Sequence, residues 1–311
     1  MTRYILPALL LALLSTTAEA KTYAEMFGPV PPLLDGLTKA KLESMDFKQG
    51  EIALPGAKAK LTIPAGFYYL DKADTRKVLV EMWGNPLTIQ DGSLGMIFPV
   101  KYTPQAPQSW SAVIDYLDEG YVSDADAEST DFNDLLVQLK KASQEQNAER
   151  KTYGQDPVTL VGWASAPLYD KANHTLHWAR DLIFGNDPNG PHTLNYSVRM
   201  LGREGILQLN FVAGLNQLQE IKDSIPAVTK LAAFDSGLTY TDFKDGDKMA
   251  AYGMAGLIAA GAGAKIATKL GLIALALAFL KKGGFVLALV AGGGLLSGIK
   301  RMFQRKAPPA A

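Results

Sequence analysis

The chain of 311 residues contains no cysteine. This absence excludes disulfide bonds, thiol catalysis, zinc or iron–sulfur sites built on cysteine, and a lipid anchor on an N-terminal cysteine. Histidine is almost as scarce, with three in the whole chain. His174 and His177 are three residues apart, but in the strand expected there their side chains would point to opposite faces. A histidine metal site is therefore not expected.

Sequence motifs of common enzymes are also lacking. Residues 162–166 lack the second glycine of a nucleophile elbow, and residues 202–205 indicate a hairpin turn rather than a phosphate-binding loop, since no helix is expected to follow. A calcium loop beginning at Asp124 would need glycine and glutamate where the chain has Ser129 and Leu135. We predict no catalytic, metal-binding or cofactor-binding residues, although a hydrolase that uses dispersed carboxylates stays open as an alternative.

Acidic residues are missing from the C-terminal part of the chain. None follows Asp247, whereas eight basic residues follow Lys248. The middle of the chain, from Lys21 to Lys248, therefore has eight more acidic than basic residues, although the formal net charge of the whole chain is zero. An acidic domain repels phosphate backbones, so nucleic acid is not an expected partner. The basic tail suits an anionic membrane surface.

Residues 1–20 have the three parts of a secretory signal peptide. Arg3 supplies positive charge, residues 5–14 form an apolar run, and Ala18-Glu19-Ala20 is a cleavage site of the A-x-A type. The apolar run is too short to span a bilayer well, so an uncleaved N-terminal anchor is the less favoured alternative. We predict cleavage after Ala20 and a mature chain that begins at Lys21.

Residues 249–299 are rich in Gly, Ala and Leu and predict a membrane anchor. Lysines interrupt the apolar runs, and no run reaches the roughly 20 residues of a comfortable span. A single span at 283–299 would place the short basic tail, residues 300–311, in the cytoplasm, in agreement with the positive-inside rule. A hairpin of two helices is the alternative. The sequence thus predicts a protein of the bacterial inner membrane, with the lipid bilayer as a partner and the main domain on the periplasmic side.

A Pro-rich segment, residues 21–49, and an exported domain, residues 50–248, lie between these ends. Short segments bounded by Pro or Gly indicate strands. They are residues 51–54, 60–63, 67–70, 95–100, 110–122, 158–164, 174–184, 192–202 and 205–213. Strand clusters without regular βαβ alternation predict an α+β fold with an antiparallel sheet meander and a few packed helices, to which the C-terminal membrane segment is added.

Helical signals are confined to a few places in this domain. Asp74 is expected to cap a short helix, and Asp131 is expected to open the longest one, which has a continuous apolar stripe. A third helix begins at Asn216 and is expected to stop before Pro226, because proline cannot continue the hydrogen-bond pattern. A further short helix is expected to hold Leu231.

The last three predicted strands form an antiparallel meander. Alternation of side chains places Trp178, Val198 and Leu209 on one buried face, with Arg180 as a polar exception, and His177 on the other face. That other face holds polar side chains that suit a glycan, a peptide or a partner subunit. This candidate binding face consists of Asn195, Arg199, Gln208 and Asn210. An ordinary solvated sheet face is the favoured alternative.

A series of short motifs occurs in a fixed order along the chain. The motifs are Trp83-Gly84-Asn85-Pro86, Gly95-Met96-Ile97-Phe98-Pro99, Gly120-Tyr121-Val122, Asn147-Ala148-Glu149-Arg150, Val161-Gly162-Trp163, Leu201-Gly202-Arg203-Glu204-Gly205 and Ala251-Tyr252-Gly253. The series resembles a bacterial family of predicted membrane-anchored proteins that are built around a single domain of unknown function. The resemblance runs from about residue 50 through the tail. It implies an exported domain with a C-terminal anchor, and it implies no activity.

These observations favour a non-enzymatic envelope protein whose exported domain binds or scaffolds at the membrane surface. Another envelope protein or a glycan would then be a further partner. The alternative is an envelope enzyme of hydrolase type that acts on a cell-wall or lipid-linked substrate. A pocket that joins Asp or Glu to Arg would favour the enzyme, and a flat sheet face would favour the binding protein.

Overall fold

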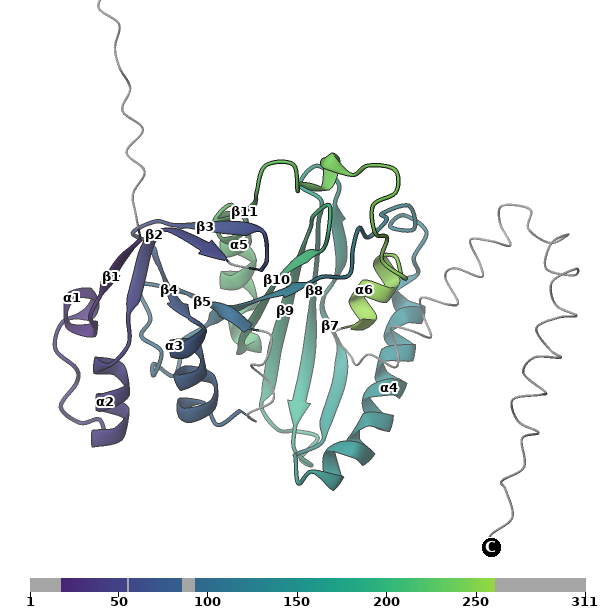
Figure 1. Cartoon of the computed structure of the whole chain (residues 1–311). Helices are drawn as coiled ribbons and strands as arrows, with labels where there is room; N and C mark the ends of the chain where they lie inside the picture. Colours follow the sequence, from purple (N-terminus) through teal and green to yellow (C-terminus); the bar gives the residue numbers. More distant parts are fainter. Residues whose placement is uncertain (1–17, 55, 86–92, 261–311) are drawn as a thin grey trace, which may run out of the picture. The chain divides into compact units, whose positions relative to one another are not determined.

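The computed structural model describes residues 18–54, 56–85 and 93–260 (Figure 1). The chain divides into two compact units. The larger unit comprises the chain up to Val122 together with residues 132–249, and the smaller one comprises residues 123–131 together with the chain from Ala250 onward. The predicted signal peptide and membrane anchor fall largely on residues 1–17 and 261–311, which lie outside the described residues.

One antiparallel sheet dominates the larger unit. Its strand order is β11-β3-β2-β4-β5-β6-β10-β9-β8-β7, and β1 pairs with β2. The strands are β1 Glu19–Lys21, β2 Phe47–Leu54, β3 Ala59–Ile63, β4 Phe67–Asp71, β5 Ser93–Pro99, β6 Ser111–Leu117, β7 Val158–Asp170, β8 Thr175–Phe184, β9 His192–Leu201, β10 Ile206–Gly214 and β11 Ala232–Phe234. A large antiparallel sheet with a few helices confirms that part of the predicted fold class.

The helices are short, with one exception. They are α1 Tyr23–Phe27, α2 Gly36–Glu43, α3 Lys72–Arg76, the π-helix η1 Lys77–Met82, α4 Phe132–Thr152, the 3₁₀ turns η3 Leu215–Gln217 and η4 Tyr240–Asp242, α5 Leu218–Thr229 and α6 Met254–Ala260. The long helix α4 begins where the sequence predicts and runs beside β7 (Figure 1). Asn147 ties the two together, because its side-chain amide both donates to the carbonyl of Val158 and accepts from its N–H.

The Pro-rich segment, residues 21–49, is folded into the larger unit. Tyr23 from α1, Leu42 from α2 and Phe47 from β2 are buried in one apolar cluster with side chains of β4 and β5. The two helices therefore pack against β2, β4 and β5. Each helix begins with a side-chain cap, Thr22 for α1 and Asp35 for α2.

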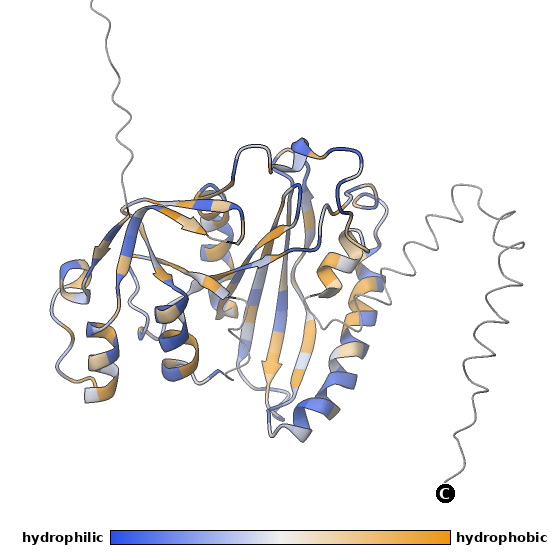
Figure 2. Ribbon diagram, in the orientation of Figure 1, coloured by the Kyte–Doolittle hydropathy of each residue, from blue (hydrophilic) through white to orange (hydrophobic). Residues whose placement is uncertain are grey.

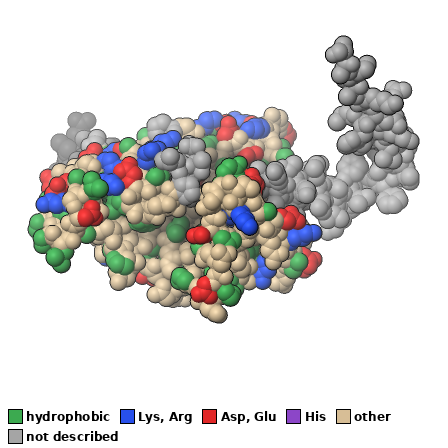
Figure 3. Space-filling model, turned by 90° about the horizontal axis from the view of Figure 1, so that it is seen from below, with side chains coloured by type: hydrophobic (Ala, Val, Ile, Leu, Met, Phe, Trp, Pro, Cys, Tyr) green, Lys and Arg blue, Asp and Glu red, His purple; other side chains and the backbone are tan. Residues whose placement is uncertain are grey.

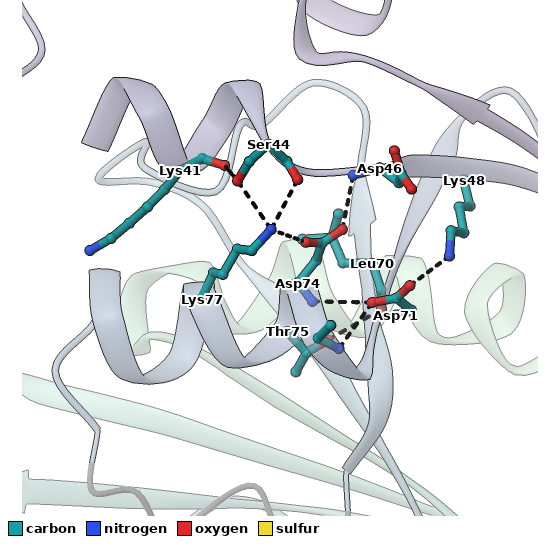
Figure 4. A network of polar contacts seen from close by, with 10 residues as sticks. Lys41, Ser44, Asp46, Lys48, Leu70, Asp71, Asp74, Thr75 and Lys77 are labelled. Atoms are coloured by element: carbon teal, nitrogen blue, oxygen red, sulfur yellow. Dashed lines mark hydrogen bonds and ion pairs between the residues drawn. The ribbon is translucent and has the colours of Figure 1, made fainter. Parts of the chain in front are cut away.

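Asp71, and not the predicted Asp74, caps helix α3. A carboxylate oxygen of Asp71 accepts from the N–H groups of Ala73 and Asp74, and the other accepts from Lys48 at 2.6 Å (Figure 4). Asp74 is buried and bonds instead to the backbone N–H of Asp46 and to the ammonium group of Lys77. The prediction is wrong because α3 begins at Lys72, so Asp71 stands at the N-cap position, whereas Asp74 lies inside the helix and bonds to the segment between α2 and β2.

Pro226 lies inside helix α5, which continues to Thr229, so the predicted stop before Pro226 is wrong. Proline removes one backbone donor, but the buried side chains of Ile221, Ile225 and Val228 hold both halves of the helix on the sheet. The short helix predicted around Leu231 is also wrong. The chain there forms strand β11, in which Ala232 pairs with residue 61 of β3.

Strands β8, β9 and β10 form the predicted meander, with one change of phase. Strands β9 and β10 alternate as predicted, since Val198 pairs with Leu209. In β8, however, His177 pairs with Val198, and Trp178 pairs with Ser197. The prediction that Trp178 shares a face with Val198 is therefore wrong, and His177 and Trp178 exchange faces.

This register defines two faces of the three strands. The α5 face is the one that carries His177, Ala179, Tyr196, Val198, Leu209 and Phe211, and α5 packs against it. The Arg199 face is the opposite one and carries Trp178, Arg180, Asn195, Ser197, Arg199, Gln208 and Asn210. Hydrophilic and hydrophobic residues are interspersed along the long strands (Figure 2).

In the smaller unit, Asp126 links the two segments of the chain. Its carboxylate accepts from the N–H of Met254 at the start of α6, and its carbonyl accepts from the hydroxyl of Thr130. Gly253 leaves room for this bond, because a Cβ atom there would lie 2.5 Å from the carboxylate. Among the residues that the structure describes, no helix has the length and apolar character needed to cross a membrane.

Candidate functional site

A groove of about 880 Å³ opens on the α5 face, between α5, the second half of β7 and the adjoining ends of β8 and β9. Its volume lies within the roughly 300–1,000 Å³ that is typical of small-molecule sites. Six apolar side chains contribute to its lining. They are Ala166, Leu168, Met200, Ile225, Pro226 and Ala232.

The groove forms where β7 departs from regular pairing. This strand ends the sheet order, and its register with β8 shifts at three places, the last between Ser165 and Leu168. Bulges bend an edge strand and redirect its side chains. Leu168 consequently keeps 67% of its surface exposed, and we infer that this bend keeps the groove open beside α5.

Three lysines also line the groove: Lys171 in the turn after β7, and Lys222 and Lys230 of the α5 segment. Asp170 is the one acidic residue in the described lining. Its carboxylate turns back onto the β7–β8 loop, where it accepts from the side chain and the N–H of Asn173. The hydrogen bond from the Asn173 side chain is the main cause that lowers the pKa of Asp170 below its ordinary value.

On the side of the molecule seen from below, by contrast, acidic and basic side chains are interspersed over the described surface (Figure 3). The described lining of the groove, with three lysines and one aspartate, has instead an excess of positive charge beside apolar side chains.

His177 and Thr175 form a polar pair at the base of the groove. The Nε2 atom of His177 lies 2.9 Å from the hydroxyl oxygen of Thr175. Burial lowers the pKa of His177 below its ordinary value of 6.5, so the ring is neutral at neutral pH. A hydroxyl beside a neutral imidazole is one element of nucleophilic catalysis. In the described part of the chain, however, no hydrogen bond orients the other ring nitrogen, and Thr175 is only 3% exposed.

The predicted binding residues lie on the Arg199 face, and the structure brings some of them together. The Nη1 atom of Arg199 donates to the side-chain oxygen of Asn210 at 2.9 Å. Gln208 pairs with Arg199 in the sheet register, whereas Asn195 lies opposite Arg180 in β8. Arg199 and Gln208 are 3% and 8% exposed, so the two central members of this face are buried.

A larger polar network surrounds these residues. The side-chain amide of Asn210 donates to Asp115 of β6 at 3.2 Å, and the guanidinium group of Arg199 stacks 4.8 Å from the ring centre of Trp178. Burial raises the pKa of Asp115, against the opposing effects of Asn210 and Arg199. Burial also lowers the pKa of Arg180 to about 10. This network provides polar partners for the buried guanidinium group of Arg199 and for the carboxyl group of Asp115.

Within the described residues, no group of three or more His, Asp or Glu side chains could hold a metal ion. The groove was not predicted from the sequence. Two of its lysines, Lys222 and Lys230, are eight residues apart along the α5 segment, but the lining also depends on the phase of β8 and the bulges of β7. The phase of β8 has no signal in the residue pattern, whereas Gly162 and Pro167 indicate irregular pairing in β7 without fixing how the strand bends.

A family model described as "Protein of unknown function (DUF2167)" matches residues 46–292. The chain belongs to this family. Both the groove and the Arg199 face lie inside the family's domain, whereas α1 and α2 precede it. Membership gives a domain without an assigned function.

None of the curated proteins is similar enough to match the chain. Among solved structures, the chain is similar to the solution structure of cyanobacterial PsbP (CyanoP) from Synechocystis sp. PCC 6803. The two chains are 8% identical, the similarity covers 59% of this chain and 91% of that chain, and the TM-score is 0.32. A similarity this weak supports no argument about function.

Proposed function

We propose that this protein is an exported, membrane-anchored binding protein whose groove holds a ligand at the periplasmic surface of a bacterial inner membrane. The groove is the observation that carries the proposal. Apolar side chains and lysines converge in one cleft of the size typical of small-molecule sites. A bend in the edge strand exposes Leu168 at this cleft, although burying it in the core would stabilise the fold.

Export and anchoring are supported by the two ends of the sequence. A signal-peptide pattern precedes Lys21, and the Gly-, Ala- and Leu-rich segment 249–299 follows the domain. Another envelope protein or a glycan is a further proposed partner. We do not propose the Arg199 face as the binding surface, because Arg199 and Gln208 are buried and engaged in the sheet.

The polar groups of the groove favour binding over catalysis. A catalytic triad needs an acid that orients the base, and the carboxylate of Asp170 is instead engaged by Asn173 in its own loop. An envelope hydrolase that acts on a lipid-linked substrate is the second candidate. The contact between Thr175 and His177 is the observation that favours it.

The absence of cysteine allows a direct test in the full chain. Leu168→Cys places a thiol in the groove, and Val137→Cys places one on α4, outside the groove lining; the native side chains are 67% and 68% exposed. Spheroplasts are treated with a membrane-impermeant thiol reagent, and the labelling rates of the two variants are compared before and after exhaustive detergent exchange. We expect both variants to be labelled, Leu168→Cys more slowly than Val137→Cys, and the two rates to converge once bound ligand is removed.

Two results would contradict the proposal in different ways. If neither cysteine reacts until the cells are lysed, the domain is not exported. If both react at the same ratio before and after detergent exchange, the groove is empty in the cell.

A further inference from the structure

We propose that the ligand of the groove is an anionic lipid of the envelope, with an acyl chain on the apolar bed and its acidic head group at the lysines. This inference rests on the proposed function and names the chemical class of the ligand. It follows from three properties of the described lining: its charge, its apolar surface and the state of its acidic group.

The charge of the groove is positive. Lys222 and Lys230 belong to the α5 segment and Lys171 to the opposite wall, so the ammonium groups come from two sides. Asp170 is the acidic residue of the described lining, and its carboxylate oxygens already accept from Asn173. A ligand with a phosphate or carboxylate group near these lysines would gain electrostatic attraction that a neutral ligand does not.

The apolar surface of the groove is formed by side chains of the sheet and of α5. Leu168 of β7 and Met200 of β9 lie on one wall, and Ile225 and Pro226 of α5 lie on the other. A soluble anion such as a sugar phosphate would leave this surface in water. An acyl chain covers it, and each methylene group that it buries raises the affinity about fourfold. The combination of lysines and apolar walls therefore fits an amphiphile better than a purely polar anion or a purely apolar molecule.

The test uses the full chain in nanodiscs of phosphatidylcholine, with an environment-sensitive dye on Leu168→Cys or, as the control position, on Val137→Cys. The probes are short-chain phosphatidylglycerol with six or eight carbons per chain, phosphatidylcholine of the same lengths, and glycerol phosphate. We expect a saturable response to phosphatidylglycerol at residue 168 alone, tighter with eight carbons than with six. Phosphatidylcholine and glycerol phosphate should bind at least tenfold more weakly.

A matched pair of charge variants sharpens the test. The double substitution Lys222→Gln and Lys230→Gln removes two groove lysines. Lys140→Gln and Lys141→Gln remove two lysines of α4 that lie outside the groove lining. We expect the first pair to weaken phosphatidylglycerol binding about tenfold, because each exposed ion pair contributes roughly a factor of two to five. The second pair should leave binding unchanged.

The outcomes separate this inference from the proposed function. Equal binding of phosphatidylcholine and phosphatidylglycerol, with no effect of the groove lysines, would overturn the anionic class and leave the groove as a lipid site. Binding of glycerol phosphate as tight as that of the lipids would overturn the acyl-chain part. No response to any lipid, in a protein whose groove cysteine is protected in cells, would overturn the lipid class while the binding function stands.

Discussion

The α5 face and the Arg199 face are two sides of the same three strands, and they are filled in different ways. The α5 face is packed with apolar side chains such as Val198, Leu209 and Phe211, and it ends in a groove. The Arg199 face buries Arg180 and Arg199. Apolar contacts have no preferred direction, so an apolar layer can stop short and leave a cavity. Buried polar groups need partners at fixed geometry, so a polar layer tolerates little change.

From this difference we infer separate roles for the two faces. We expect the Arg199 face to contribute mainly to stability, and we propose the groove at the end of the α5 face as the ligand site. Substitutions on the first face should therefore change the free energy of unfolding, and substitutions in the groove should change binding with little effect on stability.

The largest effect is expected for Trp178→Ala. Trp178 is fully buried and supports the guanidinium group of Arg199, so the substitution leaves a cavity and removes a cation–π contact. We expect it to lower the free energy of unfolding by about 3–5 kcal/mol. Urea-dependent pulse proteolysis of the detergent-solubilised full chain measures this. Val137→Ala, at an exposed position on α4, is the control and should stay within about 0.5 kcal/mol of the parent.

A smaller loss is expected for Arg199→Met, which removes the donor to Asn210 and the positive charge near Asp115. We expect a cost of about 2–3 kcal/mol, because polar groups that remain buried lose their partner. Adding Asp115→Leu should recover part of that loss, since a buried charge is no longer left behind. Strictly additive effects of the two substitutions would show that the network is not coupled, and the contrast between the faces would then fail.

The hairpin from β9 to β10 shows what the sequence can predict. Its turn is short, and the N–H of Gly202 donates to the carbonyl of Gly205 at 2.9 Å, so one register is strongly favoured. The strands, their alternation and the pairing of Val198 with Leu209 all follow from the pattern of residues. The helix α4 is equally predictable, because its apolar stripe and the acidic residue in its first turn agree.

The phase of β8 could not be predicted, because a longer turn separates it from β9. Residues 185–191 can close a hairpin with either parity, and the observed pairing of Ile183 with His192 is one of several registers. A shift of one residue moves every side chain of β8 to the other face. His177 thereby enters the groove, and Trp178 joins the Arg199 face. The groove could not be predicted for this reason and because Gly162 and Pro167, which indicate irregular pairing in β7, do not fix how the strand bends.

The smallest of the stability effects concerns the pH dependence that His177 contributes to the α5 face. Burial lowers its pKa in the folded protein below 6.5, so the folded state resists protonation. Its contribution to stability is present above that unfolded-state value and is lost as the pH falls through the lowered folded pKa. Asp170 opposes the shift, and Thr175 contacts the ring. His177→Gln should lose less stability than the parent between pH 7 and about 5. Parallel pH profiles of the two proteins would contradict a buried, titrating ring at this position.

The most direct test of the central claim, that the groove is the ligand site, is the lipid content of the full chain isolated from native membranes. After mild extraction that omits the exhaustive detergent exchange used to strip bound ligand, mass spectrometry compares the parent with Ala166→Trp, which fills the groove, and with Val137→Trp, which adds the same bulk outside it. We predict that the parent and Val137→Trp retain an anionic lipid and that Ala166→Trp loses it. Equal lipid retention by all three proteins would contradict the assignment of the groove.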